Sequence, residues 1–306
     1  MADSNKTPTG GKDDLNIDAS RCLKMRFCDS SCRRCIDICP HNAVSVDGEL
    51  IIDPEKCHGC LLCTSVCPSG ALETNLNFFD CVARLARVPA PILGCLKTAE
   101  SAHGTISCLG GLSEEHLLAL YHSLAGTLTI NLSQCKECPN SRIVEYLIER
   151  SDALVAARLS YGSCRLVLTE TADTIHFQDE LVDRRSFFKS FGKVFIKSAE
   201  TVLSAKSNEA ELQPAYAEKR IPGRKKLLNQ TRGKLPEVLQ GHLEKHFDSY
   251  VSFNESCFTC QGCVAICPTG ALQTSSVEQA PIFERLGCTG CGLCAEFCLE
   301  QSLLIT

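Results

Sequence analysis

The chain has 306 residues, a formal net charge of −5 and 23 cysteines. It is too long for a disulfide-stabilised mini-protein, and an odd number of cysteines cannot pair completely into disulfides. No apolar run approaches the roughly 18 residues of a membrane span, and the polar start excludes a secretory signal, so we expect a soluble cytoplasmic protein. The cysteines are more typical of metal ligands than of disulfide bridges.

The first cysteine-rich segment is predicted at residues 20–80, after a disordered tail at residues 1–19. Residues 57–68 follow the spacing C-x2-C-x2-C-x3-C-P, and residues 28–40 repeat it with one extra residue in the first gap. Three thiolates two residues apart on a tight loop can bind three corners of an iron–sulfur cubane. We expect short helices to follow Cys39 and Cys67, and Asp47-Gly48 predicts a hairpin with a type I′ turn.

Residues 88–180 are predicted to form a small α/β domain. Strands are expected at 90–95, 104–108, 127–132 and 165–169, with helices at 114–120 and 141–159. Three cysteine positions follow strands, where α/β folds place their ligands. Four cysteines are therefore expected to meet at one edge of the sheet: Cys95, Cys108, Cys135 and Cys138.

Three interpretations of these four cysteines stay open. The four cysteines can hold an iron–sulfur cluster of their own, a fifth one beside the four that the cysteine-rich segments at the two ends of the chain would hold. Alternatively, Cys135 and Cys138 can form a redox dithiol. In the third interpretation the set is a zinc site or consists of plain buried thiols. Cys81 and Cys164, and also Cys22 further upstream, are expected to serve in packing.

Residues 181–250 contain no cysteine and are predicted to be a helical, basic linker, with one amphipathic helix over 185–195. The cations in residues 219–226 suggest either nucleic-acid binding or, in a second interpretation, a solvated linker or a docking surface for an acidic partner. The chain is net acidic, and no aromatic residues alternate with these cations, so we favour the second interpretation.

The last segment, residues 251–306, carries two further copies of the cysteine spacing. Residues 257–268 match it without deviation, and residues 288–298 match it with Leu299 in place of the proline. Glycines within the loops let the backbone approach a cluster closely. The chain therefore carries the same double motif near each end.

These double motifs resemble the bacterial-type 2[4Fe–4S] ferredoxins, over residues 20–76 and 252–306. The resemblance implies that the fourth cysteine of each motif ligates the cluster of the other motif. Four clusters would then be held by Cys28, Cys32, Cys35 and Cys67; by Cys57, Cys60, Cys63 and Cys39; by Cys257, Cys260, Cys263 and Cys298; and by Cys288, Cys291, Cys294 and Cys267. The wider first gap makes Cys22 an alternative ligand of the first cluster.

The middle cysteines, spaced Cys-x12-Cys and Cys-x2-Cys, resemble those of thioredoxin-like [2Fe–2S] proteins and of the related small iron–sulfur subunits of hydrogenase–heterodisulfide reductase complexes. The final gap is shorter than is usual in those proteins.

The sequence thus predicts an α+β protein with two ferredoxin-like modules, a small central α/β domain of thioredoxin-like type and a helical linker. Its predicted function is that of a polyferredoxin-type subunit, which passes single electrons through four [4Fe–4S] clusters, with an additional iron–sulfur cluster in the middle domain as an open option. Expected partners are the donor and acceptor subunits of a redox complex, with no nucleic acid and no membrane span. The alternative is a thiol/disulfide oxidoreductase that uses the middle cysteines; a zinc scaffold is a third class.

Overall fold

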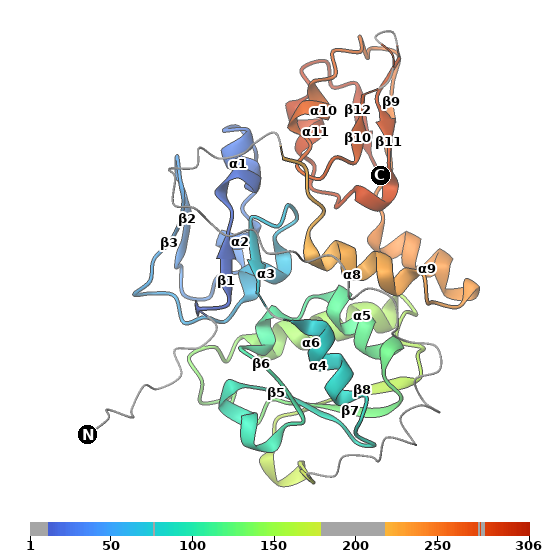
Figure 1. Cartoon of the computed structure of the whole chain (residues 1–306). Helices are drawn as coiled ribbons and strands as arrows, with labels where there is room; N and C mark the ends of the chain where they lie inside the picture. The colour runs from blue at the N-terminus through green and yellow to red at the C-terminus, as the bar shows by residue number, and fades with distance from the viewer. Residues whose placement is uncertain (1–11, 76, 179–217, 275, 277–278) are drawn as a thin grey trace.

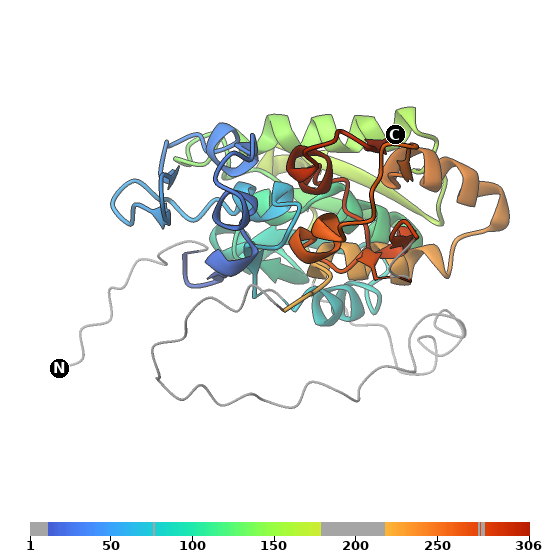
Figure 2. The ribbon, with the colours of Figure 1, turned by 90° about the horizontal axis from the view of Figure 1, so that it is seen from above.

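The computed structural model describes residues 12–75, 77–178, 218–274, 276 and 279–306. Two small cysteine-rich modules, one from each end of the chain, lie next to each other on the same side of a larger α/β domain (Figure 1). The view from above shows both modules over that domain (Figure 2). Of the disordered tail predicted at residues 1–19, residues 1–11 lie outside the described residues, whereas residues 15–17 form a strand and residue 19 begins a short helix. The helix predicted over 185–195 also lies outside the described residues.

The N-terminal module is built from very short elements. β2 and β3 pair antiparallel as the predicted hairpin, and β1 pairs antiparallel with β4. The elements are β1 (Leu15–Ile17), η2 (Ala19–Arg21), α1 (Leu23–Arg26), α2 (Arg34–Asp37), β2 (Val44–Val46), β3 (Leu50–Ile52), α3 (Leu62–Val66) and β4 (Leu72–Thr74). Such small elements enclose a limited apolar core, in which cysteine side chains are a large part.

Two local predictions for this module are wrong. The hairpin loop has three residues between the paired Val46 and Leu50, and Gly48 alone has a positive φ, so the turn is not type I′. The helices also precede Cys39 and Cys67 instead of following them. The proline after each of these cysteines explains the second error, because the residue before a proline disfavours the α conformation; Cys67 is extended, with φ −67° and ψ 113°.

The central domain contains a four-stranded parallel sheet, as the α/β prediction requires. Its order is β6-β5-β7-β8, which matches the start of the doubly wound 2-1-3-4-5 order. The strands are β5 (Ile92–Cys95), β6 (Gly104–Ile106), β7 (Gly126–Asn131) and β8 (Cys164–Thr169); the helices are α4 (Phe78–Leu85), η3 (Leu96–Ser101), η4 (Leu109–Gly111), α5 (Glu114–Ser123), α6 (Ile143–Ala156) and η5 (Ala172–Thr174). The likeness to thioredoxin stays a prediction.

The C-terminal module repeats the plan of the N-terminal one and follows two helices. β9 pairs antiparallel with β12, and β10 with β11. The elements are α8 (Gly223–Arg232), α9 (Glu237–Phe247), β9 (Val251–Phe253), α10 (Gly262–Ile266), β10 (Leu272–Gln273), β11 (Ile282–Phe283), η6 (Arg285–Gly287), α11 (Leu293–Phe297) and β12 (Leu303–Ile305). In the described part of the chain, every helix falls short of the length and apolarity that a bilayer crossing needs.

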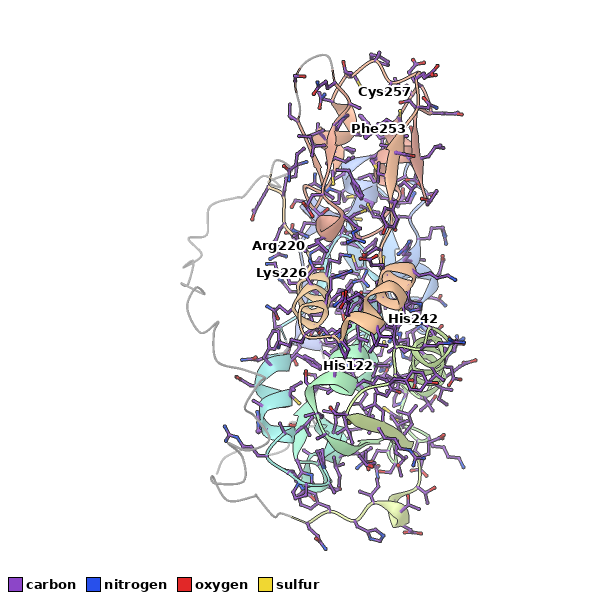
Figure 3. The ribbon with its side chains drawn as sticks, turned by 90° about the vertical axis from the view of Figure 1, so that its right-hand side faces the viewer. His122, Arg220, Lys226, His242, Phe253 and Cys257 are labelled. Atoms are coloured by element: carbon purple, nitrogen blue, oxygen red, sulfur yellow. The ribbon has the colours of Figure 1, made fainter. Side chains whose placement is uncertain are left out.

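Helices α8 and α9 connect the central domain with the N-terminal and C-terminal modules. Leu227, Leu228 and Leu243 are buried in the same core as the sheet of the central domain, and this core also takes in Cys60 and Leu62 from the N-terminal module. Seen from the side, α8 and α9 lie between the C-terminal module and the central domain (Figure 3). The central domain, α8, α9 and part of the N-terminal module therefore share one packed interior, whereas the C-terminal module has a core of its own.

The basic residues of α8 are mostly internal, so the prediction of a solvated linker or docking surface is wrong for them. Lys225 and Arg232 are 3% and 9% exposed, and their side chains reach Asp248 Oδ1 at 3.5 and 2.5 Å. Arg224 pairs with Glu115 at 2.9 Å. Charge alone could not reveal this, because the sequence does not show which anions the fold brings to these cations.

Candidate metal centres

The cysteines assigned to the second cluster line one cavity in the N-terminal module. Cys39, Cys57, Cys60 and Cys63 surround a space of about 380 Å³, including its open mouth. The remaining walls are largely apolar and include Leu15, Ala43, Val44 and Ile52. The loop wraps tightly because Gly59 and Leu61 have φ values of 65° and 60°. The fourth cysteine of one motif thus lies with three cysteines of the other.

Burial and mutual repulsion make these thiols costly to ionise on their own. Loss of hydration and the neighbouring Cys39 and Cys57 raise the pKa of Cys60 to about 11. Burial and the adjacent thiols also raise the pKa of Cys63 well above its usual value. A bound cationic centre would remove this penalty, because metal binding stabilises the thiolate form.

The C-terminal module has an equivalent cavity. Cys267, Cys288, Cys291 and Cys294, the cysteines assigned to the fourth cluster, line a space of about 350 Å³, including its open mouth. Burial raises the pKa of both Cys291 and Cys294 to about 12, and neighbouring thiols add to it.

Cys267 differs from its neighbours in this cavity because the hydrogen bonds that it accepts outweigh the effect of burial. Burial raises its pKa, but donors that include the Thr269 hydroxyl, 3.5 Å from Sγ, and backbone N–H groups outweigh burial and lower it. Ser302 lies 3.2 Å from Cys298 Sγ and lowers the pKa of Cys298 in the same way. Hydrogen bonds of this kind also tune the potential of a cluster. The sequence analysis missed these hydroxyls, although each follows its cysteine by two or four residues.

The cysteines assigned to the first cluster gather less completely. Burial raises the pKa of Cys35 to about 12, and Cys67, Cys22 and Cys32 contribute repulsion. Cys28 is exposed, with its Sγ 3.7 Å from Asp29 Oδ1. Cys67 and Cys32 act on the pKa of the buried Cys22, and Cys22 acts on that of Cys35. Cys22 thus lies close to three cysteines of this group.

The cysteines assigned to the third cluster lie on the exposed side of the C-terminal module. Burial raises the pKa of Cys263 to about 11, with repulsion from Cys260 and Cys257. Gly262, between two of these cysteines, packs against the ring of Phe297, the residue before Cys298. An added Cβ on Gly262 would lie 3.0 Å from that ring.

The two cavities each bring four cysteines together, and this donor set fits a cubane. Among the residues that the structure describes, no three Cys, His, Asp or Glu side chains converge on one ion-sized point. A zinc ion holds its sulfurs at about 2.3 Å and therefore within roughly 4 Å of one another. A cubane spreads its ligands, because each thiolate binds a different iron.

The middle cysteines lie at the carboxyl edge of the parallel sheet. Cys95 ends β5, Cys108 follows β6, and Cys135 and Cys138 follow β7. Burial raises the pKa of Cys108 to about 12, with repulsion from Cys60, Cys95 and Cys135. Burial likewise raises the pKa of Cys135 to about 12, with repulsion from Cys95 and Cys138. The structure therefore brings these four cysteines into one neighbourhood.

The remaining two cysteines of the central domain are buried elsewhere. Cys81 is 3% exposed on α4, and Cys164 is 4% exposed at the start of β8. Both belong to the main hydrophobic core. Packing remains the interpretation that we assign to them.

The two ferredoxin-like modules touch through their cysteine loops, a contact that the sequence analysis missed. The rings of Phe27 and Phe297 meet edge to face with centroids 5.3 Å apart. The Ser31 N–H donates to Glu296 Oε1 at 3.2 Å, and the Ser31 hydroxyl donates to the same oxygen. The repeated Phe-Cys pair, which ends in Cys28 and in Cys298, was the available signal.

Two family models match the ends of the chain. Both are described as 4Fe-4S dicluster domains, and they match residues 27–71 and 240–303. The chain is similar to the pyruvate synthase subunit PorD of Methanocaldococcus jannaschii, with 34% identity over 70 residues, which is 22% of this chain and 73% of that protein.

Two further relatives match over much smaller shares of their length. The indolepyruvate oxidoreductase subunit IorA of Methanothermobacter thermautotrophicus is 45% identical over 43 residues, 14% of this chain and 7% of that protein. The archaeal-type glutamate synthase [NADPH] of Thermotoga maritima is 27% identical over 82 residues, 26% of this chain and 16% of that protein. The chain carries a 4Fe-4S dicluster domain at each end, and it belongs to the family of 4Fe-4S dicluster ferredoxins.

Proposed function

We propose that this protein relays single electrons through four [4Fe–4S] clusters, as a subunit of a larger cytoplasmic oxidoreductase complex. The proposed ligand sets are Cys28, Cys32, Cys35 and Cys67; Cys39, Cys57, Cys60 and Cys63; Cys257, Cys260, Cys263 and Cys298; and Cys267, Cys288, Cys291 and Cys294. Such clusters supply reversible one-electron chemistry when bound. The chain's own residues hold them, exclude water and set their potentials.

The observation that carries this proposal is the crossed grouping of the cysteines. Cys39 shares a cavity with the three loop cysteines of the following motif, and Cys267 does so in the C-terminal module. In two-cluster ferredoxins the fourth cysteine of each motif ligates the other cluster, and this grouping follows that pattern. The crossing also brings the two sites of a module close together, because Cys35 contributes to the electrostatic surroundings of Cys63.

The contact between the modules supports a relay that runs through the whole chain. Phe297 precedes a proposed ligand of the third cluster, and its ring meets Phe27, which precedes a proposed ligand of the first. Glu296 and Ser31 add two hydrogen bonds at the same place. Electrons can therefore cross from one module to the other within one molecule.

The relatives support a place in a larger assembly. The named similarities include a subunit of pyruvate synthase and a subunit of indolepyruvate oxidoreductase. Cluster ligation needs reduced cysteines, and this supports a reducing compartment such as the cytoplasm. We therefore propose that a donor and an acceptor protein dock on the module surfaces.

Variants of single ligands test the assignment. In anaerobically prepared protein reduced with dithionite, we expect Cys60→Ala to lose the EPR signal of one cubane, while Cys81→Ala, at a buried packing position, keeps every signal. An unchanged spectrum for Cys60→Ala would contradict the ligand set. For the first cluster we expect the loss in Cys28→Ala; a loss in Cys22→Ala with an intact Cys28→Ala spectrum would assign Cys22 in its place.

The relay is tested at the contact between the modules. Replacing Phe297 by Ala together with Glu296→Gln should leave the iron content unchanged and slow the redistribution of electrons between the modules after pulse reduction. Leu299→Ala is the control, because this side chain is 93% exposed. Equal rates in the double variant and the wild type would contradict direct transfer across this contact.

A further inference from the structure

We propose that Cys95, Cys108, Cys135 and Cys138 hold a fifth iron–sulfur centre, and that this centre exchanges electrons with the second cubane of the N-terminal module. The inference rests on the proposed function, because it needs an electron relay beside it. It extends that function by giving the central domain a redox role of its own.

The topology of the sheet carries the first part of the argument. All strands are parallel, and the connection from β6 to β7 passes over β5, so the direction of winding reverses between β5 and β7. Open α/β sheets bind ligands at this reversal, just outside the carboxyl ends of the strands. Cys95 closes β5, and Cys135 follows the end of β7 by four residues. The cysteines therefore lie where this fold places a ligand.

The environment of the four thiols favours a bound cluster over a reactive dithiol. Cys95, Cys108 and Cys135 are 8%, 7% and 4% exposed, and Cys138 is half-buried. Catalytic thiols need partial exposure and a positive neighbourhood that favours the thiolate. Three of these four thiols are buried, and each of the four lies near other thiols of the set. Four cysteines are also the usual complement for one iron–sulfur cluster.

The loops that carry these cysteines pack directly on the second cubane site. Asn140, two residues after Cys138, donates through Nδ2 to the His58 carbonyl at 3.0 Å, within the loop between Cys57 and Cys60. Its Oδ1 lies 3.1 Å from Nε2 of His41, which follows Cys39 by two residues. Asn140 is 6% exposed, so this contact is internal.

A second loop makes the same approach. Gly110 follows Cys108 by two residues, and its Cα is so close to the N-terminal module that an added Cβ would lie 2.3 Å from the Cys60 carbonyl oxygen. Cys108 itself lies within electrostatic range of Cys60. Both loops of the central domain thus contact the loop that carries Cys60, and an electron can pass between the two sites through these contacts.

The proposed step transfers one electron from the second cubane to the fifth centre. The reduced second cubane loses one electron, the oxidised fifth centre gains it, and no covalent bond forms or breaks. The electron comes from the one-electron donor that feeds the relay, for which dithionite substitutes in the experiment.

The experiment counts iron and labile sulfide in the full chain, reconstituted without oxygen. Four cubanes account for about sixteen iron atoms; we expect the wild type to exceed that number, and Cys108→Ser/Cys135→Ser to fall to it. Cys164→Ser is the matched control, since it removes a buried cysteine of the same sheet, and it should keep the full content. Retention of about sixteen iron atoms also reports that the ferredoxin modules of each variant have folded.

Each other outcome overturns the inference. Equal iron in the wild type and the double variant excludes a fifth centre; a Cys135–Cys138 disulfide in the wild type would then indicate a dithiol, and stoichiometric zinc would indicate a zinc site. A wild type without iron would instead refute the four-cluster function itself. Cys138→Ala, at the half-buried member of the set, repeats the test with little change to the core and should also lose the additional iron.

Discussion

Gly110 offers a sharp test of how the central domain packs against the N-terminal module. A Cβ at this position would lie 2.3 Å from the Cys60 carbonyl oxygen and 2.9 Å from Ile143 Cγ2. Ordinary contacts of this kind lie at 3.4–4 Å, so the Gly110→Ala methyl is more than 1 Å too close to a backbone atom. Either the loop or the module must move.

The cost is that of overpacking. Insertions into a packed interior cost roughly 1–3 kcal/mol, and we expect about 3 kcal/mol because the obstacle is backbone rather than a flexible side chain. The movement would also disturb the hydrogen bonds of Arg150. Its guanidinium donates to the Leu112 carbonyl in the central domain and to Ser65 Oγ in the N-terminal module, both at 2.7 Å.

The assay is denaturant unfolding of the anaerobic protein, followed by far-UV circular dichroism. Gly241→Ala is the matched control, because nothing lies within 4 Å of its added Cβ in α9. Alanine should stabilise that helix by about 0.5–1 kcal/mol relative to glycine. A Gly110→Ala protein as stable as the wild type would refute the packing that we describe between the Cys60 loop and the central domain.

Three further changes follow from buried polar groups. Asp248→Asn should lower the free energy of unfolding by roughly 3–5 kcal/mol, since it leaves two buried cations without their anion. Asp37→Asn, in an exposed ion pair, should lower it by at most about 1 kcal/mol. Equal losses for the two variants in urea unfolding would contradict this expectation. Burial lowers the pKa of His116 from 6.5 to about 4. As the pH falls, the unfolded chain therefore takes up the proton first, and the free energy of unfolding should fall by up to about 3 kcal/mol between pH 6.5 and 4. A His116→Gln variant with an equally steep pH dependence would exclude this histidine as the cause. Thr269→Val should lower the reduction potential of the fourth cluster, because it removes a hydroxyl 3.5 Å from Cys267 Sγ that favours the more negative, reduced state; an unchanged or higher potential in a redox titration would contradict it.

The cysteine spacing was the most informative part of the sequence. Motifs such as residues 57–68 fix their loop geometry locally, and they predicted the two ferredoxin domains that the family models match. The strands and helices of the central domain also followed from local patterns. For example, the helix predicted from residue 114 begins there as α5, with Glu114 and Glu115 in its first turn.

The contacts between the parts could not be predicted from such patterns. The cations of α8 suggested a solvated surface, but they pair with Glu115, 109 residues away from Arg224, and with Asp248, just after α9. Asn140 and Gly110 carried no signal of their own, because their role depends on the loops that fold against them. Long-range contacts of this kind are set by the tertiary fold rather than by local residue preference.

The most direct measurement of the central claim is the iron, labile sulfide and zinc content of the full chain purified without oxygen. The account predicts a brown protein with at least about sixteen iron atoms per chain, a similar amount of sulfide and no stoichiometric zinc. A colourless protein with zinc, or with no labile sulfide, would contradict it.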